Sequence, residues 1–207
     1  MRATAVAIML GQELEAFTSG LGPHYLFLYS AVRGLEAQAV FEFGVGRSTE
    51  TILLALEETQ GHLFSCAPKP WETTHPRHTH FPVTSEAARA HVDEHRRIPP
   101  LELVLHDGSH DAETVAADLA WVLPRVRPLG LVLVHDSAHS YSGPGVRAGI
   151  RAALEAAAEF GVETSRVTLP YAFGLTIIRV ETSLYHAPLQ LTRTKVGSPH
   201  HTEPCRE

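Results

Sequence analysis

Apolar runs and amphipathic segments alternate along most of this chain. Short apolar runs predict buried strands at residues 39–45, 62–67, 80–84, 101–107 and 131–136. Apolar residues at helical spacing predict helices at 23–37, from Ser48 or Thr49 to Gly61, and at 85–97, 111–123 and 145–161. Strands that alternate with helices favour an α/β fold, in which helices cover both faces of an open, mostly parallel sheet.

The last two predicted strands, at about 164–169 and 173–180, have no helix between them. A parallel pair needs a long crossover connection, so we expect the last strand to pair antiparallel in a hairpin at one edge of the sheet. Residues 128–130 read Pro-Leu-Gly and predict a turn, and residues 68–80 hold three prolines and predict a loop. The sequence shows no internal repeat and no second domain.

Length and composition fit one globular domain. The chain has 207 residues, of which 44% are hydrophobic and 19% are charged. A net charge of -6 argues against a nucleic-acid partner, although 14 histidines would weaken that argument below neutral pH. Cys66 and Cys205 are too few for a disulfide framework, and no apolar run approaches the roughly 18 residues of a membrane span. We therefore expect a cytoplasmic protein, and we interpret the apolar N-terminal stretch as a helix rather than a signal peptide.

The first predicted strand leads into the stretch FEFGVGRSTE, in which chemistry and turn signals coincide. Gly44 and Gly46 allow a sharp turn and a close approach of a ligand to the backbone, and the following helix offers free N–H groups. Glu42 lies inside the apolar run, where a carboxylate needs a partner such as a ligand ammonium or a nearby N–H. The alternative is a plain strand-turn-helix corner, because two glycines alone are a weak nucleotide signal.

Two later strands end in similar clusters, LHDGSHD at 105–111 and LVHDSAH at 133–139. Since the ends of neighbouring parallel strands meet at one edge, we expect Asp107 and Asp136 to face each other. With Ser137 they would suit a hard cation such as Mg²⁺, whereas His106, His110, His135 and His139 would favour a transition metal. Paired acids without a metal are the third interpretation. For Asp111 we expect a helix N-cap.

These motifs together resemble the class I S-adenosylmethionine-dependent methyltransferases, of the small-molecule O-methyltransferase type. The resemblance runs over about residues 23–180 and rests on FEFGVGRST, on the D-G-x-H and H-D motifs, and on FGLTIIR. It implies a single Rossmann-like three-layer domain with a seven-stranded sheet whose last strand is antiparallel. On this basis we divide the chain into an N-terminal helical segment (1–38), the Rossmann-like domain (39–182), and a C-terminal extension and tail (183–207).

The resemblance also implies roles for single residues. The S-adenosylmethionine site would include residues near its methionine end and its adenosine: Glu42, Gly44, Gly46, Ser48, Thr84, Ser85 and Asp107. Asp107, Asp136 and Ser137 match metal positions of metal-dependent relatives. The family's ribose-binding acid after the second strand is missing, because Cys66 and Ala67 stand there and Glu72 is the nearest acid. The family's acid after the third strand is missing too, at Thr84 and Ser85.

The sequence therefore predicts methyl transfer to a hydroxyl of a small molecule, assisted by Mg²⁺ if the metal site is real. His110 is the first candidate for the general base and His139 the second. Trp71 in the loop and Tyr141 in segment 137–145 suggest a polar, partly aromatic acceptor such as a sugar or a phenol. The main alternative is a methyltransferase-fold protein that binds a ligand without transfer, motivated by the two missing acids. A nicotinamide-dependent oxidoreductase and a metal-dependent hydrolase are further alternatives, and the N-terminal segment is a candidate homodimer contact.

Overall fold

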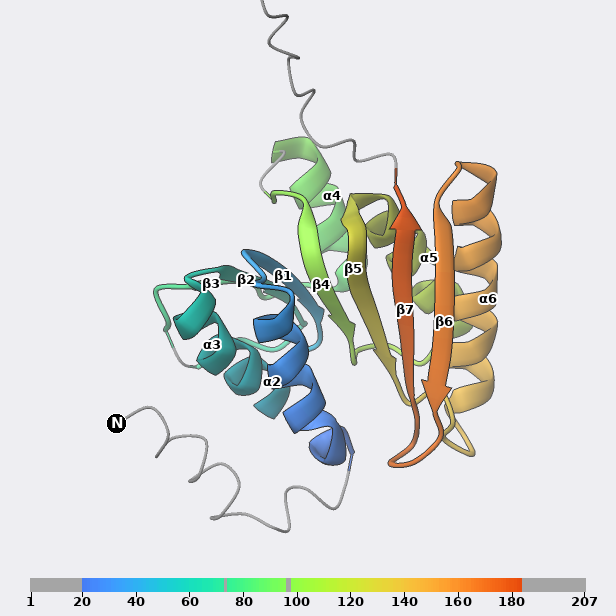
Figure 1. Cartoon of the computed structure of the whole chain (residues 1–207), viewed down its shortest axis with the longest axis horizontal. Coiled ribbons are helices and arrows are strands. Elements are labelled where there is room, and N and C mark those ends of the chain that lie inside the picture. Colours follow the sequence, from blue (N-terminus) through green and yellow to red (C-terminus); the bar gives the residue numbers. More distant parts are fainter. Residues whose placement is uncertain (1–19, 73, 96–97, 184–207) are drawn as a thin grey trace, which may run out of the picture.

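A computed structural model of the chain describes residues 20–72, 74–95 and 98–183. Within them, seven strands form one sheet in the order β3-β2-β1-β4-β5-β7-β6 (Figure 1). The strands are β1 (Ala39–Phe43), β2 (His62–Cys66), β3 (His78–Phe81), β4 (Leu101–His106), β5 (Val126–His135), β6 (Glu163–Leu169) and β7 (Leu175–Thr182). Strands β1 to β5 run parallel, and β7 is antiparallel to both β5 and β6. The predicted α/β, Rossmann-like fold is confirmed.

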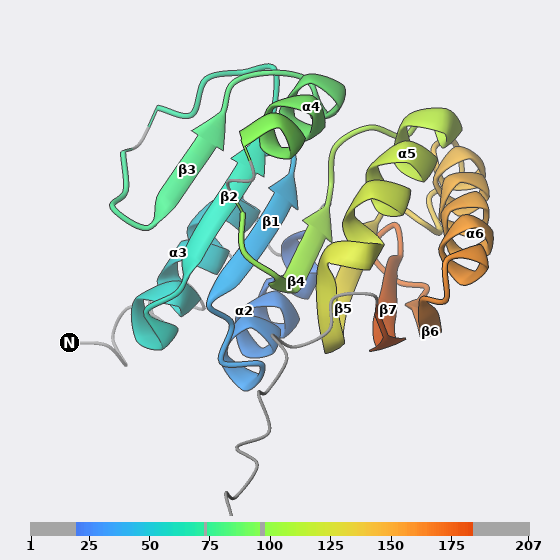
Figure 2. The same ribbon diagram turned by 90° about the horizontal axis from the view of Figure 1, so that it is seen from above.

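Helices cover both faces of this sheet. They are η2 (Gly22–His24), α2 (Tyr25–Gly34), α3 (Arg47–Thr59), α4 (Ser85–His95), α5 (Ala112–Val122), η3 (Leu123–Arg125) and α6 (Gly143–Glu159). α2 and α3 lie on one face, and α4, α5 and α6 lie on the other (Figure 2). The apolar core accordingly forms two clusters, one on each face of the central strands. Every residue of β1 is buried, as expected for a central parallel strand.

Several local predictions were wrong by a few residues. α3 begins at Arg47 with Gly46 as its N-cap, rather than at Ser48 or Thr49, because the Thr49 hydroxyl accepts a hydrogen bond from the Gly46 N–H at 2.9 Å. The helix ends at Thr59, and the left-handed residue that follows it is Gln60, not Gly61. β3 begins at His78 and ends at Phe81, so it lies two to three residues earlier than predicted.

The predicted turn at 128–130 lies inside β5. There Leu129 has a φ of 70°, and the pairing of β4 with β5 shifts register between Leu101 and Leu103. The Pro-Leu-Gly signal therefore marks a bulge, which interrupts the pairing without ending the strand. The late hairpin is confirmed: β6 is the outermost strand, and β7 lies between β6 and β5.

None of the helices in the described ranges is long and apolar enough to cross a membrane. β1 begins at Ala39 and β7 ends at Thr182, but the division of the chain into three segments stays a prediction. The predicted N-terminal helix and the C-terminal tail fall mostly in residues 1–19 and 184–207, outside the described residues. The carboxyl ends of β4 and β5 lie at the lower edge of the sheet in Figure 1, near the start of α2.

Candidate active site

The two glycines after β1 differ in what they do. Gly44 has a φ of 101°, and a Cβ built on it would lie 2.5 Å from the backbone oxygen of Asp107. This close approach lets the end of β1 lie against the end of β4, where the Asp107 N–H donates to the Phe43 carbonyl at 2.9 Å. Gly46 has an extended φ of 177°, and a Cβ on it would meet nothing within 4 Å. The first glycine is required by the fold, and the second leaves open space at the N-terminus of α3.

Glu42 is fully buried in β1, and its partners are hydroxyl groups. Its carboxyl group accepts hydrogen bonds from Ser48 Oγ at 2.5 Å and from Thr49 Oγ1 at 2.7 Å. Burial raises the pKa of Glu42 from 4.5 to about 8, against the opposing effect of the two hydroxyls. The sequence predicted that this carboxylate needs a partner, and α3 supplies two. Glu42 thus ties the end of β1 to the first turn of α3 and fixes the glycine turn between them.

We expect the pH dependence of folding to reveal this buried acid. Because the folded-state pKa of Glu42 lies above its unfolded value, the folded state retains a proton that the unfolded state loses between about pH 4.5 and pH 8. The free energy of unfolding should therefore fall with rising pH in this window, by up to about 1.4 kcal/mol per pH unit from this group. In Glu42→Gln this contribution disappears. Urea unfolding at pH 5, 6.5 and 8 should therefore show that the free energy of unfolding of the variant rises relative to that of the wild type as the pH increases. Parallel pH profiles of the two proteins would contradict it.

Asp107, His135 and Asp136 form a compact cluster at the ends of β4 and β5. Their ligand-type atoms all lie within 4.8 Å of one another. His135 Nδ1 lies 3.0 Å from Asp107 Oδ1 and 3.4 Å from Asp136 Oδ2, and its Nε2 lies 3.1 Å from the carbonyl oxygen of Ala172. Both ring nitrogens thus face acceptors, which only a doubly protonated imidazolium satisfies. Burial opposes this charge, but the two carboxylates outweigh it and raise the pKa of His135 to about 10.

His110 pairs with Asp136 in a different way. Its Nε2 lies 2.7 Å from Asp136 Oδ2, and its side chain is 46% exposed. Nε2–H donates to the carboxylate, and Nδ1 has no hydrogen-bond partner in the part of the chain that the structure describes, so its lone pair is available to a ligand. Burial favours protonation of Asp136, but the hydrogen bonds from His135 and His110 prevail and lower its pKa. Asp136 is therefore a carboxylate that orients His110 and would stabilise the imidazolium formed when His110 takes a proton.

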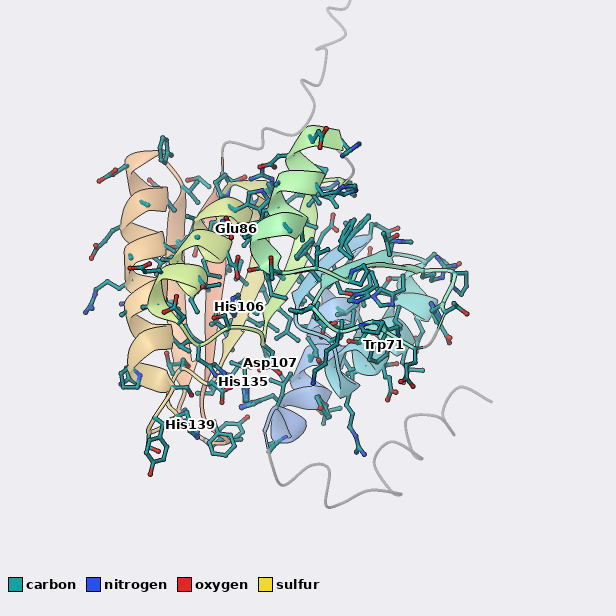
Figure 3. The ribbon with its side chains drawn as sticks, turned by 180° about the vertical axis from the view of Figure 1, so that it is seen from behind. Trp71, Glu86, His106, Asp107, His135 and His139 are labelled. Atoms are coloured by element: carbon teal, nitrogen blue, oxygen red, sulfur yellow. The ribbon has the colours of Figure 1, made fainter. Side chains whose placement is uncertain are left out.

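A cavity of about 340 Å³ opens over these groups. Asp107, His110, His135 and Asp136 line it, together with His139 and Phe173. Figure 3 shows Asp107, His135 and His139 gathered at one end of the sheet beside α2, whereas Trp71 lies on the β2–β3 side. The structure thus brings together both candidate bases and the two acids that the sequence singled out.

Other predicted site residues have local structural partners. Ser137 is buried, and its hydroxyl accepts a hydrogen bond from Thr176 at 2.8 Å. Thr84 immediately precedes Ser85, the first residue of α4. Its Oγ1 accepts a hydrogen bond from the Ala87 N–H and so caps the helix. Asp111 caps α5 by accepting from the Thr114 N–H, as expected. The assignment of Ser137 to a metal, and of Thr84 and Ser85 to a cofactor, stays a prediction.

The central position of His135 was not predicted, although it was one of four candidate histidines. It depends on the Ala172 carbonyl, which the β6–β7 loop supplies from far along the chain. His24 was missed altogether: it is fully buried, and its ring lies 4.6 Å from Tyr171 and 5.9 Å from His135 between centroids. The one sequence signal for His24 was its place beside Pro23 at the start of a predicted helix.

The end of β2 carries no carboxylate in its own strand. Cys66 is buried there as a thiol, with a pKa raised by burial to about 12, and Glu72 is exposed in the following loop. The Ser65 hydroxyl lies between two histidines of β3, at 2.7 Å from His78 Nε2 and 2.9 Å from His80 Nδ1. What takes the place of the family's ribose-binding acid at this strand end stays a prediction.

Residues 41–137 match the family model described as a methyltransferase domain, from β1 through the glycine turn to the acids after β4 and β5. These residues of the chain are similar to a methyltransferase domain. The match supports the family that the sequence motifs resemble. No curated protein matches the sequence.

Solved structures share the fold of this chain. MycE, from the mycinamycin biosynthetic pathway, in complex with Mg, SAH and mycinamycin VI, aligns with a TM-score of 0.57 at 20% identity, over 82% of this chain and 52% of MycE. An O-methyltransferase from Bacillus cereus in complex with SAH gives 0.59 at 16% identity, over 87% and 90% of the two chains. TomG from Streptomyces achromogenes, involved in tomaymycin synthesis and in complex with SAM, gives 0.59 at 17% identity, over 80% and 82%. The chain spans about half the length of MycE. At these low identities the structural similarity shows a shared fold alone.

Two places in this region have the chemistry to hold a negatively charged ligand group and a cation. The space beside Gly46 lies at the N-terminus of α3, where backbone N–H groups favour a negatively charged ligand group such as a carboxylate. Asp107 and Asp136 offer the carboxylate oxygens that Mg²⁺ prefers. The His135 imidazolium lies within hydrogen-bonding distance of Asp107, so that its positive charge partly balances the negative charge of the two carboxylates.

Proposed function

We propose that this protein transfers a methyl group from S-adenosylmethionine to a hydroxyl oxygen of a small molecule. The observation that carries the proposal is the His110–Asp136 pair, which borders the cavity and in which His110 Nδ1 has no partner among the described residues. Asp107, whose backbone touches the glycine turn, lines the same cavity. A base at the cavity, and a glycine turn that touches a residue of the same cavity, supply the two parts that O-methyl transfer requires.

In the proposed reaction, S-adenosylmethionine supplies the methyl group, and the chain supplies the base and the alignment. The acceptor oxygen forms the new bond to carbon, the carbon–sulfur bond breaks with its electron pair going to sulfur, and the hydroxyl proton passes to His110 Nδ1. Asp136 accepts the hydrogen bond from Nε2–H throughout and stabilises the positive charge that His110 gains. Because the sulfonium charge disappears as the new bond forms, the chain's main task is to hold the oxygen in line with the carbon–sulfur bond.

Asp107 and Asp136 would hold Mg²⁺ if a metal takes part. A bound divalent cation would lower the pKa of a coordinated hydroxyl. His135 would affect metal binding, because its Nδ1 already lies within hydrogen-bonding distance of one of the candidate ligand atoms, Asp107 Oδ1. A bound metal would therefore compete with an internal hydrogen bond. We propose metal assistance as the second, separable part of the function.

Ligand-induced changes in melting temperature test both parts. S-adenosylhomocysteine at about a hundred times its dissociation constant should stabilise the protein by about 2.7 kcal/mol. Mg²⁺ should add a further shift that is lost in Asp107→Asn, while Asp93→Asn serves as the control because Asp93 is half-exposed and pairs with Arg125 on the α4–α5 face. Stabilisation by the nucleoside without any Mg²⁺ effect would remove the metal from the proposal and leave the methyl transfer.

The second candidate function is ligand binding without transfer. The end of β2 motivates it, because Cys66 and Ala67 stand where the family places a ribose-binding acid. No thermal shift with millimolar S-adenosylhomocysteine would favour this candidate over the first. The expectations of a cytoplasmic location, of no nucleic-acid partner and of a homodimer stay predictions, and the proposed dimer contact lies outside the described residues.

A further inference from the structure

The two cavity histidines have opposite hydrogen-bonding arrangements. His139 Nδ1 accepts hydrogen bonds from the backbone N–H groups of Tyr141 and Ser142, each at 3.2 Å. An acceptor nitrogen carries no proton, so the neutral ring of His139 carries its proton on Nε2. His110 is the reverse, since its Nε2–H donates to Asp136 and its Nδ1 is free. His110 therefore offers a lone pair to a ligand, and His139 offers a proton donor.

Exposed aromatic rings surround the His139 side chain. Phe173 packs edge-on against it with ring centroids 4.7 Å apart, and Tyr141 lies at 5.9 Å. Phe173 is 43% exposed and Tyr141 is 90% exposed, although both are large aromatic side chains. Of the two rings, Phe173 lines the cavity, and an exposed ring in that position is typical of surfaces that receive a flat, apolar ligand face.

The β6–β7 loop holds Phe173 in this place at a conformational cost. Ala172 and Phe173 have φ values of 50° and 65°, which side chains with a Cβ rarely adopt. The loop is fastened to the segment after β5, because the Phe173 carbonyl accepts the N–H of Ala138 at 2.7 Å. The same loop supplies the Ala172 carbonyl to His135. Phe173, His139 and the acid cluster are thus held in a fixed relation to one another.

We propose that His139 is a specificity-determining residue that donates its Nε2–H to a second oxygen of the acceptor. This inference rests on the proposed methyl transfer and narrows its substrate class. The acceptor is a flat ring that lies against Phe173 and carries an ether, carbonyl or hydroxyl oxygen next to the hydroxyl that is methylated. His139 is not the alternative base that its sequence position suggested, because its only free nitrogen bears the proton.

The ring tautomer of His139 is the first test, and it needs no substrate. Long-range ¹H–¹⁵N correlation spectra of the full chain, assigned with His139→Gln, should show His139 as the Nε2–H tautomer at neutral pH. His110→Gln assigns the second ring. A His139 ring with its proton on Nδ1 would overturn the proposal whether or not the protein is an enzyme.

Methyl transfer to three matched phenols tests the acceptor class. With labelled S-adenosylmethionine, kcat/KM for catechol and guaiacol should exceed that for phenol by about three- to tenfold, which is the effect of one hydrogen bond. His139→Ala should abolish this preference mainly through KM, and His139→Gln, which keeps a neutral N–H donor, should restore part of it. The pH profile of kcat should be the same in both variants as in the wild type.

The outcomes separate this inference from the function on which it rests. Equal rates on the three phenols, transfer to none of them, or loss of the acidic limb of the pH profile in His139→Gln would overturn the role of His139. Stabilisation by S-adenosylhomocysteine would still support the proposed function in each of those cases. Absence of that stabilisation, with the Nε2–H tautomer observed, would instead contradict the proposed function.

Discussion

Replacement of His110 by glutamine should lower kcat for methyl transfer by about a hundred- to ten-thousand-fold. Glutamine can still donate an N–H to Asp136, so that the local hydrogen bond found at 2.7 Å in the wild type has a substitute. It has no lone pair basic enough to take the proton from the acceptor hydroxyl. The loss should therefore appear in kcat, measured as label transferred from S-adenosylmethionine, with little change in melting temperature.

A matched control is available on another surface of the protein. His95 lies in the last turn of α4 and is exposed, with its Nδ1 2.8 Å from the His91 carbonyl, so His95→Gln makes the same chemical change away from the cavity. That variant should keep the wild-type kcat, and both variants should keep the stabilisation by S-adenosylhomocysteine. Full turnover by His110→Gln would assign proton removal to another group, and a metal-bound hydroxyl at Asp107 and Asp136 would then be the next candidate.

The fold was predictable because each of its central strands is mostly apolar, with few polar residues inside it. β1 and β4 are buried on both faces, and buried strands separated by amphipathic helices leave few arrangements other than a covered parallel sheet. The errors occurred where a local signal had two meanings. Pro-Leu-Gly at 128–130 is typical of a turn, but here Leu129 takes the left-handed conformation inside β5 and the strand continues past it. Only the pairing with β4 distinguishes a bulge from a turn.

The site was predictable to the extent that it depends on strand ends. Asp107 and Asp136 end neighbouring parallel strands, and they do lie together. What the sequence lacked was the direction of each side chain. Asp136 has a φ of 58°, and the next residue, Ser137, points instead to Thr176 on β7. The role of His135 likewise depends on the Ala172 carbonyl, which becomes its neighbour only when the β6–β7 hairpin is in place. The His139 ring is set by N–H groups of its own loop, at Tyr141 and Ser142, and by the Phe173 ring of the β6–β7 loop.

Replacement of Gly44 by alanine should reduce the free energy of unfolding by about 2–4 kcal/mol. Its φ of 101° is unfavourable for any residue with a Cβ, and the added methyl group would lie 2.5 Å from the Asp107 carbonyl oxygen. Since that oxygen belongs to the backbone, relief requires β1 and β4 to separate at their ends. For a chain of this size, the cost corresponds to about 4–16 °C in melting temperature. Calorimetry or urea unfolding measures it directly.

Gly46→Ala is the matched control, because it adds the same methyl group two residues away. The extended φ of Gly46 suits alanine, and nothing lies within 4 Å of the new atom, so stability should change by about 1 kcal/mol or less. If the open space beside Gly46 receives the cofactor, this variant should instead bind S-adenosylhomocysteine about tenfold or more weakly, which titration calorimetry measures. Gly44→Ala would then affect mainly the stability of the fold, and Gly46→Ala mainly the affinity for the cofactor, although both residues lie in one turn. Unchanged affinity in Gly46→Ala would place the nucleoside elsewhere and remove the glycine turn from the cofactor site.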